Sequence, residues 1–254
     1  MPDPKRFAGR TAIVTGAARG IGAATAARLA EEGAQVLLAD LAPEVMARAE
    51  AIGGVGLRID LAARGAGEAV VDTALDAFGR LDILVNNAGI GGSKPLVESD
   101  DELLDRFIHT NLTAVLRLTR AAIPHLARPG GRIVSVSSTF GIAGYPGTTA
   151  YAVAKAGIAQ MTRQLAAELG PEGILVNAVA PGVIETAMTE GHLTRDHYRR
   201  AVLEPTPLRR AGKPEEVAAV IAFLASGDAA YVAGQVVAVD GGWLAARHPP
   251  REAG

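Results

Sequence analysis

Short apolar runs alternate with longer amphipathic stretches along the whole chain, and this alternation constrains the fold most. The apolar runs span residues 11–15, 35–39, 55–59, 82–85, 132–136, 175–178 and 235–239. Stretches with helical periodicity lie between them, at 21–32, 43–51, 63–78, 99–127 and 150–169, and a last one starts near residue 214. Strands that alternate with helices of this length form βαβ units and a parallel sheet.

The apolar runs are continuous, as expected of strands that helices cover on both faces. We therefore predict an α/β fold with one doubly wound, seven-stranded parallel sheet of Rossmann-like topology, whose ligand site lies at the carboxyl ends of the strands. No linker divides the chain, so residues 1–254 are expected to form a single domain. The polar segment at about 186–213 is predicted to be a substrate lid. The polar tail at about 247–254 is expected to be poorly ordered.

Composition excludes several classes of function. The chain has no cysteine, which excludes disulfides, thiolate nucleophiles and cysteine-based metal sites. The net charge is −2 and no basic block is present, so nucleic acid is not an expected partner. The first ten residues lack a signal-peptide core, and Ser, Thr, Gly and Pro interrupt the longest uncharged stretch, 133–154. We expect a cytoplasmic protein that does not enter a membrane.

Three glycines follow the first predicted strand, in the sequence TGAARGIG at 15–22, and open the first predicted helix. Gly16 permits a tight turn, Gly20 lets backbone N–H groups approach a pyrophosphate, and Gly22 allows close packing of helix on strand. An ordinary strand–helix turn is the alternative. The position directly after the first strand favours a dinucleotide-binding loop.

Tyr151 and Lys155 lie four residues apart in a predicted helix and therefore share one face. A free tyrosine has a pKa of about 10, but a nearby lysine cation and a positively charged nicotinamide ring would stabilise its phenolate. The alternative is a surface aromatic beside a solvated lysine. Ser137 and Ser138 end the fifth predicted strand, and strand alternation does not choose between them. Asn111 lies inside a predicted helix, where asparagine is a mediocre helix former and could simply be exposed.

These motifs resemble, in order, those of the short-chain dehydrogenase/reductase family. They are TG-x-x-x-G-x-G at 15–22, NNAG at 86–89, Tyr-x-x-x-Lys at 151–155 and Pro-Gly at 181–182, so the resemblance covers nearly the whole chain. It implies a homotetramer with the catalytic residues Asn111, Ser138, Tyr151 and Lys155. By family spacing Ser138 orients the substrate oxygen, and Asn111 holds a water that links Lys155 to solvent.

The same resemblance assigns cofactor binding to a larger set of residues. This set comprises Gly16, Arg19, Gly20, Ile21, Gly22, Asp40, Asp60, Leu61, Asn87, Ala88, Gly89, Tyr151, Lys155, Pro181, Gly182, Ile184 and Thr186.

The choice between NAD and NADP depends on Asp40 and Arg19. A carboxylate at residue 40 can accept hydrogen bonds from ribose hydroxyls and repels a 2′-phosphate, whereas Arg19 could pair with that phosphate. We give Asp40 more weight. Repulsion between its buried carboxylate and a 2′-phosphate is larger in free energy than the attraction that one solvated arginine provides. NAD is therefore the predicted cofactor and NADP the less favoured one. Asp60 is predicted to contact the adenine, and a helix cap is the alternative for Asp40 and Asp60 alike.

The sequence thus predicts an NAD-dependent oxidoreductase that transfers a hydride between NAD(H) and a secondary alcohol or ketone, with Tyr151 as the acid/base. The alternatives are an NADPH-dependent ketoreductase of the 3-oxoacyl-carrier-protein type and a non-catalytic NAD-binding scaffold. The partner is a small alcohol or carbonyl substrate, which the sequence does not identify. No metal site is expected, since His192 and His197 lack the helical spacing of a zinc pair. Both histidines are expected on a solvated face of the lid. The lid also contains several arginines, which could attract an anionic substrate, but a solvated or subunit-facing surface is the expected place for them. They are Arg195, Arg199, Arg200, Arg209 and Arg210.

Overall fold

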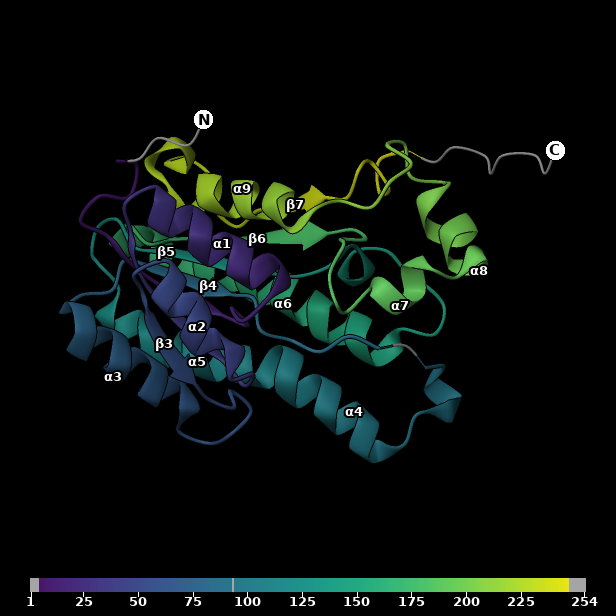
Figure 1. The fold of residues 1–254 in the computed structure, drawn as a ribbon, viewed down its shortest axis with the longest axis horizontal. Coiled ribbons are helices and arrows are strands. Elements are labelled where there is room, and N and C mark those ends of the chain that lie inside the picture. The colour runs from purple at the N-terminus through teal and green to yellow at the C-terminus, as the bar shows by residue number, and fades with distance from the viewer. Residues whose placement is uncertain (1–4, 93, 247–254) are drawn as a thin grey trace.

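Seven parallel strands form one sheet, as predicted (Figure 1). Their order across the sheet is β3-β2-β1-β4-β5-β6-β7. The structure is a computed structural model that describes residues 5–92 and 94–246. The strands are β1 (Thr11–Thr15), β2 (Gln35–Asp40), β3 (Val55–Arg58), β4 (Ile83–Asn86), β5 (Arg132–Val136), β6 (Leu175–Pro181) and β7 (Val236–Val239). The chain reverses its direction of winding between β3 and β4, which flank β2 and β1. A crevice therefore opens at the carboxyl ends of β1 and β4.

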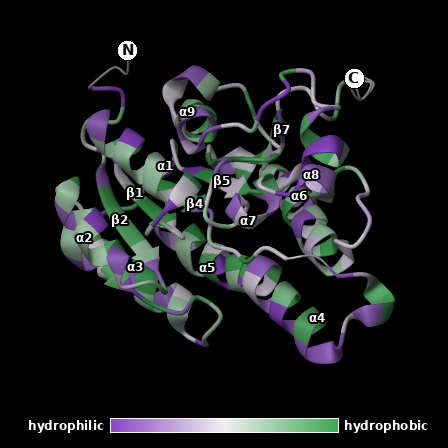
Figure 2. Cartoon of the chain, turned by 45° about the vertical axis from the view of Figure 1, so that its right-hand side comes forward, coloured by the Kyte–Doolittle hydropathy of each residue, from purple (hydrophilic) through white to green (hydrophobic). Residues whose placement is uncertain are grey.

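Helices cover both faces of this sheet, so the strands are apolar on both sides. One layer contains α1 (Gly20–Glu31), α2 (Glu44–Ala51) and α9 (Pro214–Ala225), and the other contains α3 (Ala66–Phe78), α5 (Ala114–Ala122) and α6 (Thr149–Leu169). In β1, Ala12 and Val14 pack in the first core and Ile13 in the second. Figure 2 shows hydrophobic colour along β1 and β2, with hydrophilic patches on the outer helices.

The helix predicted over 99–127 is present without interruption over 101–125, but it is not α-helical throughout. The structure has α4 (Asp101–Ile108), a π-helical turn (His109–Thr113), α5 and a 3₁₀ turn (Ile123–His125). The side-chain amide of Asn111 donates to the carbonyl oxygen of Phe107 at 3.2 Å, and the backbone N–H of an ordinary α-helix would bind that carbonyl. A polar side chain that competes with the backbone in this way accompanies the wider turn.

Two other predicted segments differ in detail. The helix expected from residue 63 begins at Ala66, because Gly65 is left-handed with φ of 79°. The segment 186–213 is irregular, with α7 (Glu190–Leu193), α8 (Asp196–Tyr198) and a π-helical turn (Arg199–Leu203). The tail predicted at 247–254 lies outside the described residues. Within residues 5–92 and 94–246, no helix combines the length and apolarity that crossing a membrane requires.

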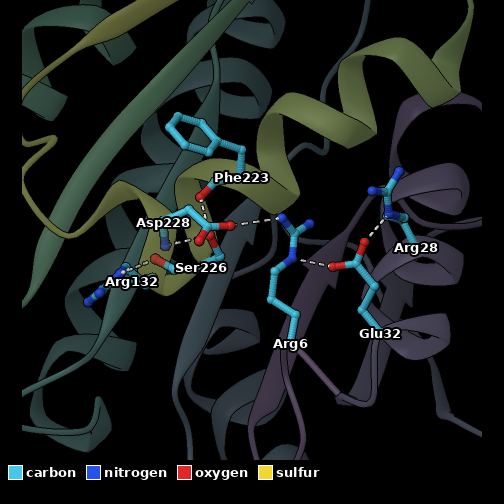
Figure 3. A network of polar contacts seen from close by, with 7 residues as sticks. All are labelled: Arg6, Arg28, Glu32, Arg132, Phe223, Ser226 and Asp228. Atoms are coloured by element: carbon cyan, nitrogen blue, oxygen red, sulfur yellow. Dashed lines mark hydrogen bonds and ion pairs between the residues drawn. The ribbon is translucent and has the colours of Figure 1, made fainter. Parts of the chain in front are cut away.

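A buried carboxylate joins three elements at the amino ends of the strands (Figure 3). Glu32, at the end of α1, is fully buried and accepts from the guanidinium groups of Arg6 and Arg28. Arg6 also reaches Asp228 at 3.4 Å, just beyond α9. This network fixes the start of the chain and the last helix at the end of the sheet that lies opposite the crevice.

Candidate active site

A cavity of about 660 Å³ opens at the carboxyl ends of the strands. Residues after β4, β5 and β6 form its floor, the start of α6 forms one wall, and the segment from Thr186 to Ala201 forms another. All four catalytic candidates line this cavity. The fold therefore brings together residues that are up to 44 positions apart in the sequence, from Asn111 to Lys155.

The glycine loop packs directly against the Asn-Asn-Ala-Gly segment that follows β4. A Cβ added at Gly16 would lie 2.8 Å from the Cα of Ala88, and one added at Gly22 would lie 2.2 Å from the carbonyl oxygen of Gly16. The side-chain amide of Asn87 donates to the carbonyl oxygens of Thr15 and Gly16, at 2.9 and 3.1 Å. Only glycine fits at these two positions, so the loop forms a cradle of backbone at the N-terminus of α1, which suits a pyrophosphate.

The segment after β6 closes the other side of this cradle. A Cβ added at Gly20 would approach the methyl group of Thr186 to 3.2 Å, so the glycine loop and Thr186 face each other. The hydroxyl of Thr189 donates to the carbonyl oxygen of Ile184 and also receives the backbone N–H of Thr186. The predicted residues Pro181, Gly182, Ile184 and Thr186 all line the cavity.

Asp40 ends β2 beside the glycine loop and is not a helix cap. Its carboxylate accepts the backbone N–H groups of Ala18 and Ala42, both at 2.9 Å. The guanidinium Nε of Arg58, which pairs in register with Asp40, donates to the carbonyl oxygen of Leu41 at 3.2 Å. Arg19 is exposed at the first turn of α1. Arg58 therefore lies beside the Asp40 position, and Arg19 precedes the first residue of α1.

Asp60 and Leu61 follow β3 at the far side of the cradle. The Asp60 carboxylate accepts the N–H of Ala62 at 2.9 Å, which forms a local turn. Since α3 begins only at Ala66, Asp60 does not cap a helix.

Tyr151, Ser138 and Lys155 form a cluster at the bottom of the cavity. Tyr151 and Lys155 lie on one face of α6, with the Lys155 Nζ atom 5.8 Å from the centre of the Tyr151 ring. The Nζ atom donates to the carbonyl oxygen of Val136 at 2.8 Å. Phe107 packs edge-on against the Tyr151 ring, with centroids 6.4 Å apart. These contacts fix the positions of both side chains.

Burial is the main cause of the pKa shifts in this cluster. It raises the pKa of Tyr151, and a hydrogen bond with Ser138 opposes that shift. It also lowers the pKa of Lys155 from 10.5 to about 8. The sequence predicts that a lysine cation and a bound nicotinamide ring together stabilise the Tyr151 phenolate. In the protein without cofactor the pKa of Tyr151 is raised, because desolvation of the phenolate outweighs the hydrogen bond with Ser138.

The structure distinguishes Ser137 from Ser138 and decides whether Asn111 is exposed. The hydroxyl of Ser137 donates to the carbonyl oxygen of Lys155 at 2.8 Å, whereas Ser138 contacts Tyr151. Asn111 is fully buried, which rules out the exposed alternative. Its amide oxygen accepts the N–H of Ile90 at 3.0 Å, and a Cβ on Gly89 would lie 2.5 Å from that oxygen.

A family comparison agrees with this geometry. A family model described as "Enoyl-(Acyl carrier protein) reductase" matches residues 16–244. The chain belongs to the short-chain dehydrogenase/reductase family. It is 43% identical to the 3-oxoacyl-(acyl-carrier-protein) reductase FabG of Thermotoga maritima, over 93% of this chain and 98% of the relative. It is 44% identical to cis-4-hydroxycyclohexanecarboxylate dehydrogenase of Sinomonas cyclohexanicum, over 94% of this chain and 98% of that one.

A solved structure of the same family has the same fold. It is a short chain dehydrogenase from Burkholderia cenocepacia in complex with NADP, with a TM-score of 0.88 and 36% identity. The match covers 94% of this chain and all of that one. The protein described here is therefore an oxidoreductase of the short-chain dehydrogenase/reductase family.

Two groups of site residues escaped the sequence analysis of this family member. Thr15 ends β1, and its hydroxyl accepts the N–H groups of Asn87 and Ala88, at 3.0 and 3.1 Å. Its position directly before Gly16 could have indicated a role in the glycine loop. His192, Arg195 and His197 also line the cavity, while Arg195 and His197 are exposed as expected of the lid and His192 is half-buried. No periodicity marks them, because the lid is irregular.

Proposed function

We propose that the protein interconverts a ketone and a secondary alcohol with a bound nicotinamide cofactor. The observation that carries this proposal is the Ser138–Tyr151–Lys155 cluster, which lies in one cavity beside a glycine cradle. The bound cofactor would donate or accept the hydride. The glycine loop, Asn87 and the 181–186 segment are the residues that would hold it.

The family resemblance suggests a task for each catalytic candidate. Ser138 and Tyr151 would hydrogen-bond the substrate oxygen and support the charge that develops there. Tyr151 would pass the proton to or from that oxygen. With a cofactor bound, Lys155 would leave the carbonyl of Val136, bind the nicotinamide ribose and relay the proton. Asn111 would hold the water at the end of that relay.

The names of the relatives support ketone reduction as the favoured direction. Tyr151 is a protonated phenol at neutral pH, which is the form that gives a proton to a carbonyl oxygen. One relative is named as a 3-oxoacyl reductase, and a reductase acts on the ketone. We therefore prefer a ketoreductase to the alcohol dehydrogenase that the sequence analysis placed first.

Two cofactors remain candidates, each with its own support. Asp40 supports NAD(H), because its carboxylate stands where a 2′-phosphate would approach. The NADP-bound relative supports NADP(H), with Arg19 and Arg58 as the groups that would pair with the phosphate. The comparisons favour NADP(H). Steady-state kcat/KM with NADH and NADPH decides between them. An Asp40→Ser variant should shift the ratio toward NADPH by about tenfold or more, since one lost charge repulsion is about 1.4 kcal/mol or more.

The reaction itself is tested with Tyr151→Phe. The variant should reduce a ketone panel with a kcat lowered at least about a thousandfold, while the Kd of reduced nicotinamide nucleotide changes little. Tyr231→Phe is the matched control, because Tyr231 is fully exposed outside the cavity. Near-normal turnover by the Tyr151 variant would refute the assignment. Loss of nucleotide binding in that variant would show a role in folding or binding.

The homotetramer, the cytoplasmic location and the closing lid remain proposals. Light scattering coupled to size-exclusion chromatography tests the tetramer directly, with a mass about four times the 26.0 kDa of one chain.

A further inference from the structure

The charge lining the catalytic cavity is entirely of one sign. No aspartate or glutamate among the described residues lines it. The side chains that can carry positive charge are Lys155, His192, Arg195 and His197. Lys155 belongs to the catalytic cluster, so the other three stand together on one wall, within six residues of the lid. A cavity of this kind attracts a negatively charged group.

Arg195 differs from the other lid arginines. It alone of the five lines the catalytic cavity, and its guanidinium has no hydrogen bond or ion pair with any described side chain. By contrast Arg210, at the neighbouring cavity, is paired with Glu216 through bonds of 2.8 and 2.6 Å. An unpaired guanidinium at the wall of a cavity offers the planar pair of donors that binds a carboxylate in bidentate fashion.

A contact between two aromatic rings stabilises the part of the lid that contains Arg195. The rings of His192 and Tyr198 pack together with centroids 5.3 Å apart. The Tyr198 phenol is neutral at neutral pH and therefore does not oppose an anion. Met188, Tyr145 and Phe140 supply apolar surface between this wall and the catalytic cluster.

We propose that the substrate carries an anionic group away from its reactive carbonyl, and that Arg195 binds this group with His192 and His197. The substrate class is an oxo acid, or its hydroxy-acid product, with the carbonyl at Ser138 and Tyr151 and the carboxylate at the lid. This inference rests on the proposed function. The anion could also be a phosphate of a carrier-linked thioester, which has the same chemistry toward a guanidinium.

Matched pairs of substrates test the inference. 4-Oxocyclohexanecarboxylate is compared with its methyl ester, and acetoacetyl-coenzyme A with the neutral N-acetylcysteamine thioester. Each is assayed with wild type, Arg195→Gln and the control Arg199→Gln, whose arginine lies in the lid outside the cavity. A hydrogen bond to a charged group is about 1.5–3 kcal/mol, so Arg195→Gln should raise KM for the anionic substrate by about 10- to 100-fold. The neutral partner and the control should change less than about threefold.

The outcomes separate the two sources of anion and the two proposals. Selective loss with the oxo acid supports a carboxylate, and selective loss with acetoacetyl-coenzyme A alone supports a phosphate. Equal effects on anionic and neutral substrates overturn the inference while leaving the proposed function intact. If no ketone is reduced, the proposed function fails. Calorimetric binding of 4-oxocyclohexanecarboxylate to the Tyr151→Phe protein, with and without Arg195→Gln, then still tests the anion site.

Discussion

Replacing Lys155 with methionine should make folding stability less dependent on alkaline pH. Lys155 is buried in the cofactor-free protein, and burial lowers its pKa from 10.5 to about 8. One pKa unit corresponds to about 1.4 kcal/mol, so this difference amounts to about 3 kcal/mol of stability that depends on protonation. Methionine keeps the length and the apolar stem of lysine but binds no proton.

The sign follows from which state holds the proton. Between pH 8 and 10.5 the unfolded chain keeps the Lys155 proton and the folded chain releases it. The unfolded state then binds more protons, so the free energy of unfolding rises with pH across this window. Below pH 8 the folded chain also carries the buried charge, and the full penalty of about 3 kcal/mol is present. The wild type should therefore gain about 3 kcal/mol relative to Lys155→Met between pH 7 and 10.5.

Urea unfolding followed by circular dichroism measures this difference at pH 7, 8, 9 and 10. Other groups that titrate in the window, Tyr151 and Tyr198 among them, are present in both proteins and cancel in the comparison. Lys94→Met is the control, since Lys94 is exposed and should show no such trend. A difference between wild type and Lys155→Met that stays constant with pH would refute the argument that burial governs this lysine.

Further predictions follow from single contacts. Glu32→Gln should lower the free energy of unfolding by about 2 kcal/mol, since two partly buried guanidiniums lose their shared carboxylate, whereas Glu68→Gln at an exposed pair should cost under about 1 kcal/mol. Equal effects in urea unfolding would contradict this. Gly22→Ala should abolish nucleotide binding, measured by nucleotide fluorescence, because its Cβ would lie 2.2 Å from a loop carbonyl oxygen. Binding at wild-type Kd would disprove the tight cradle. Ser138→Ala should lower kcat about 100-fold with little change in Tm, and Ser137→Ala should lower stability by about 1 kcal/mol with kcat within a few fold. A large loss of kcat in Ser137→Ala and a loss of stability alone in Ser138→Ala would contradict this assignment.

The sheet could be predicted from the sequence because burial on both faces makes each strand a continuous apolar run. Thr11–Thr15, for instance, is buried at every position. The cofactor loop could also be predicted, since backbone contact there requires glycine at fixed spacing. Both features depend on residues close together in the chain.

What escaped prediction depends on contacts between distant parts of the chain. Periodicity along 99–127 did not show the π-helical turn, because it arises where one side chain, that of Asn111, takes a backbone acceptor. Alternation did not separate Ser137 from Ser138, since their partners lie on α6. The upward shift of the Tyr151 pKa in the cofactor-free protein also escaped prediction, because a sequence shows which charges are near but not how deeply a side chain is buried.

The close packing of the glycine loop on Asn87 and Ala88 has a consequence for folding. The loop follows β1, and its partner follows β4, which pairs with β1 although three helices and two strands lie between them in the chain. The nucleotide site therefore exists only when both halves of the sheet have docked, a step that requires closure of a long loop. A nucleotide that binds only this docked state stabilises the native chain by mass action. Nucleotide supplied during refolding should thus raise the yield of native protein by capturing the docked state.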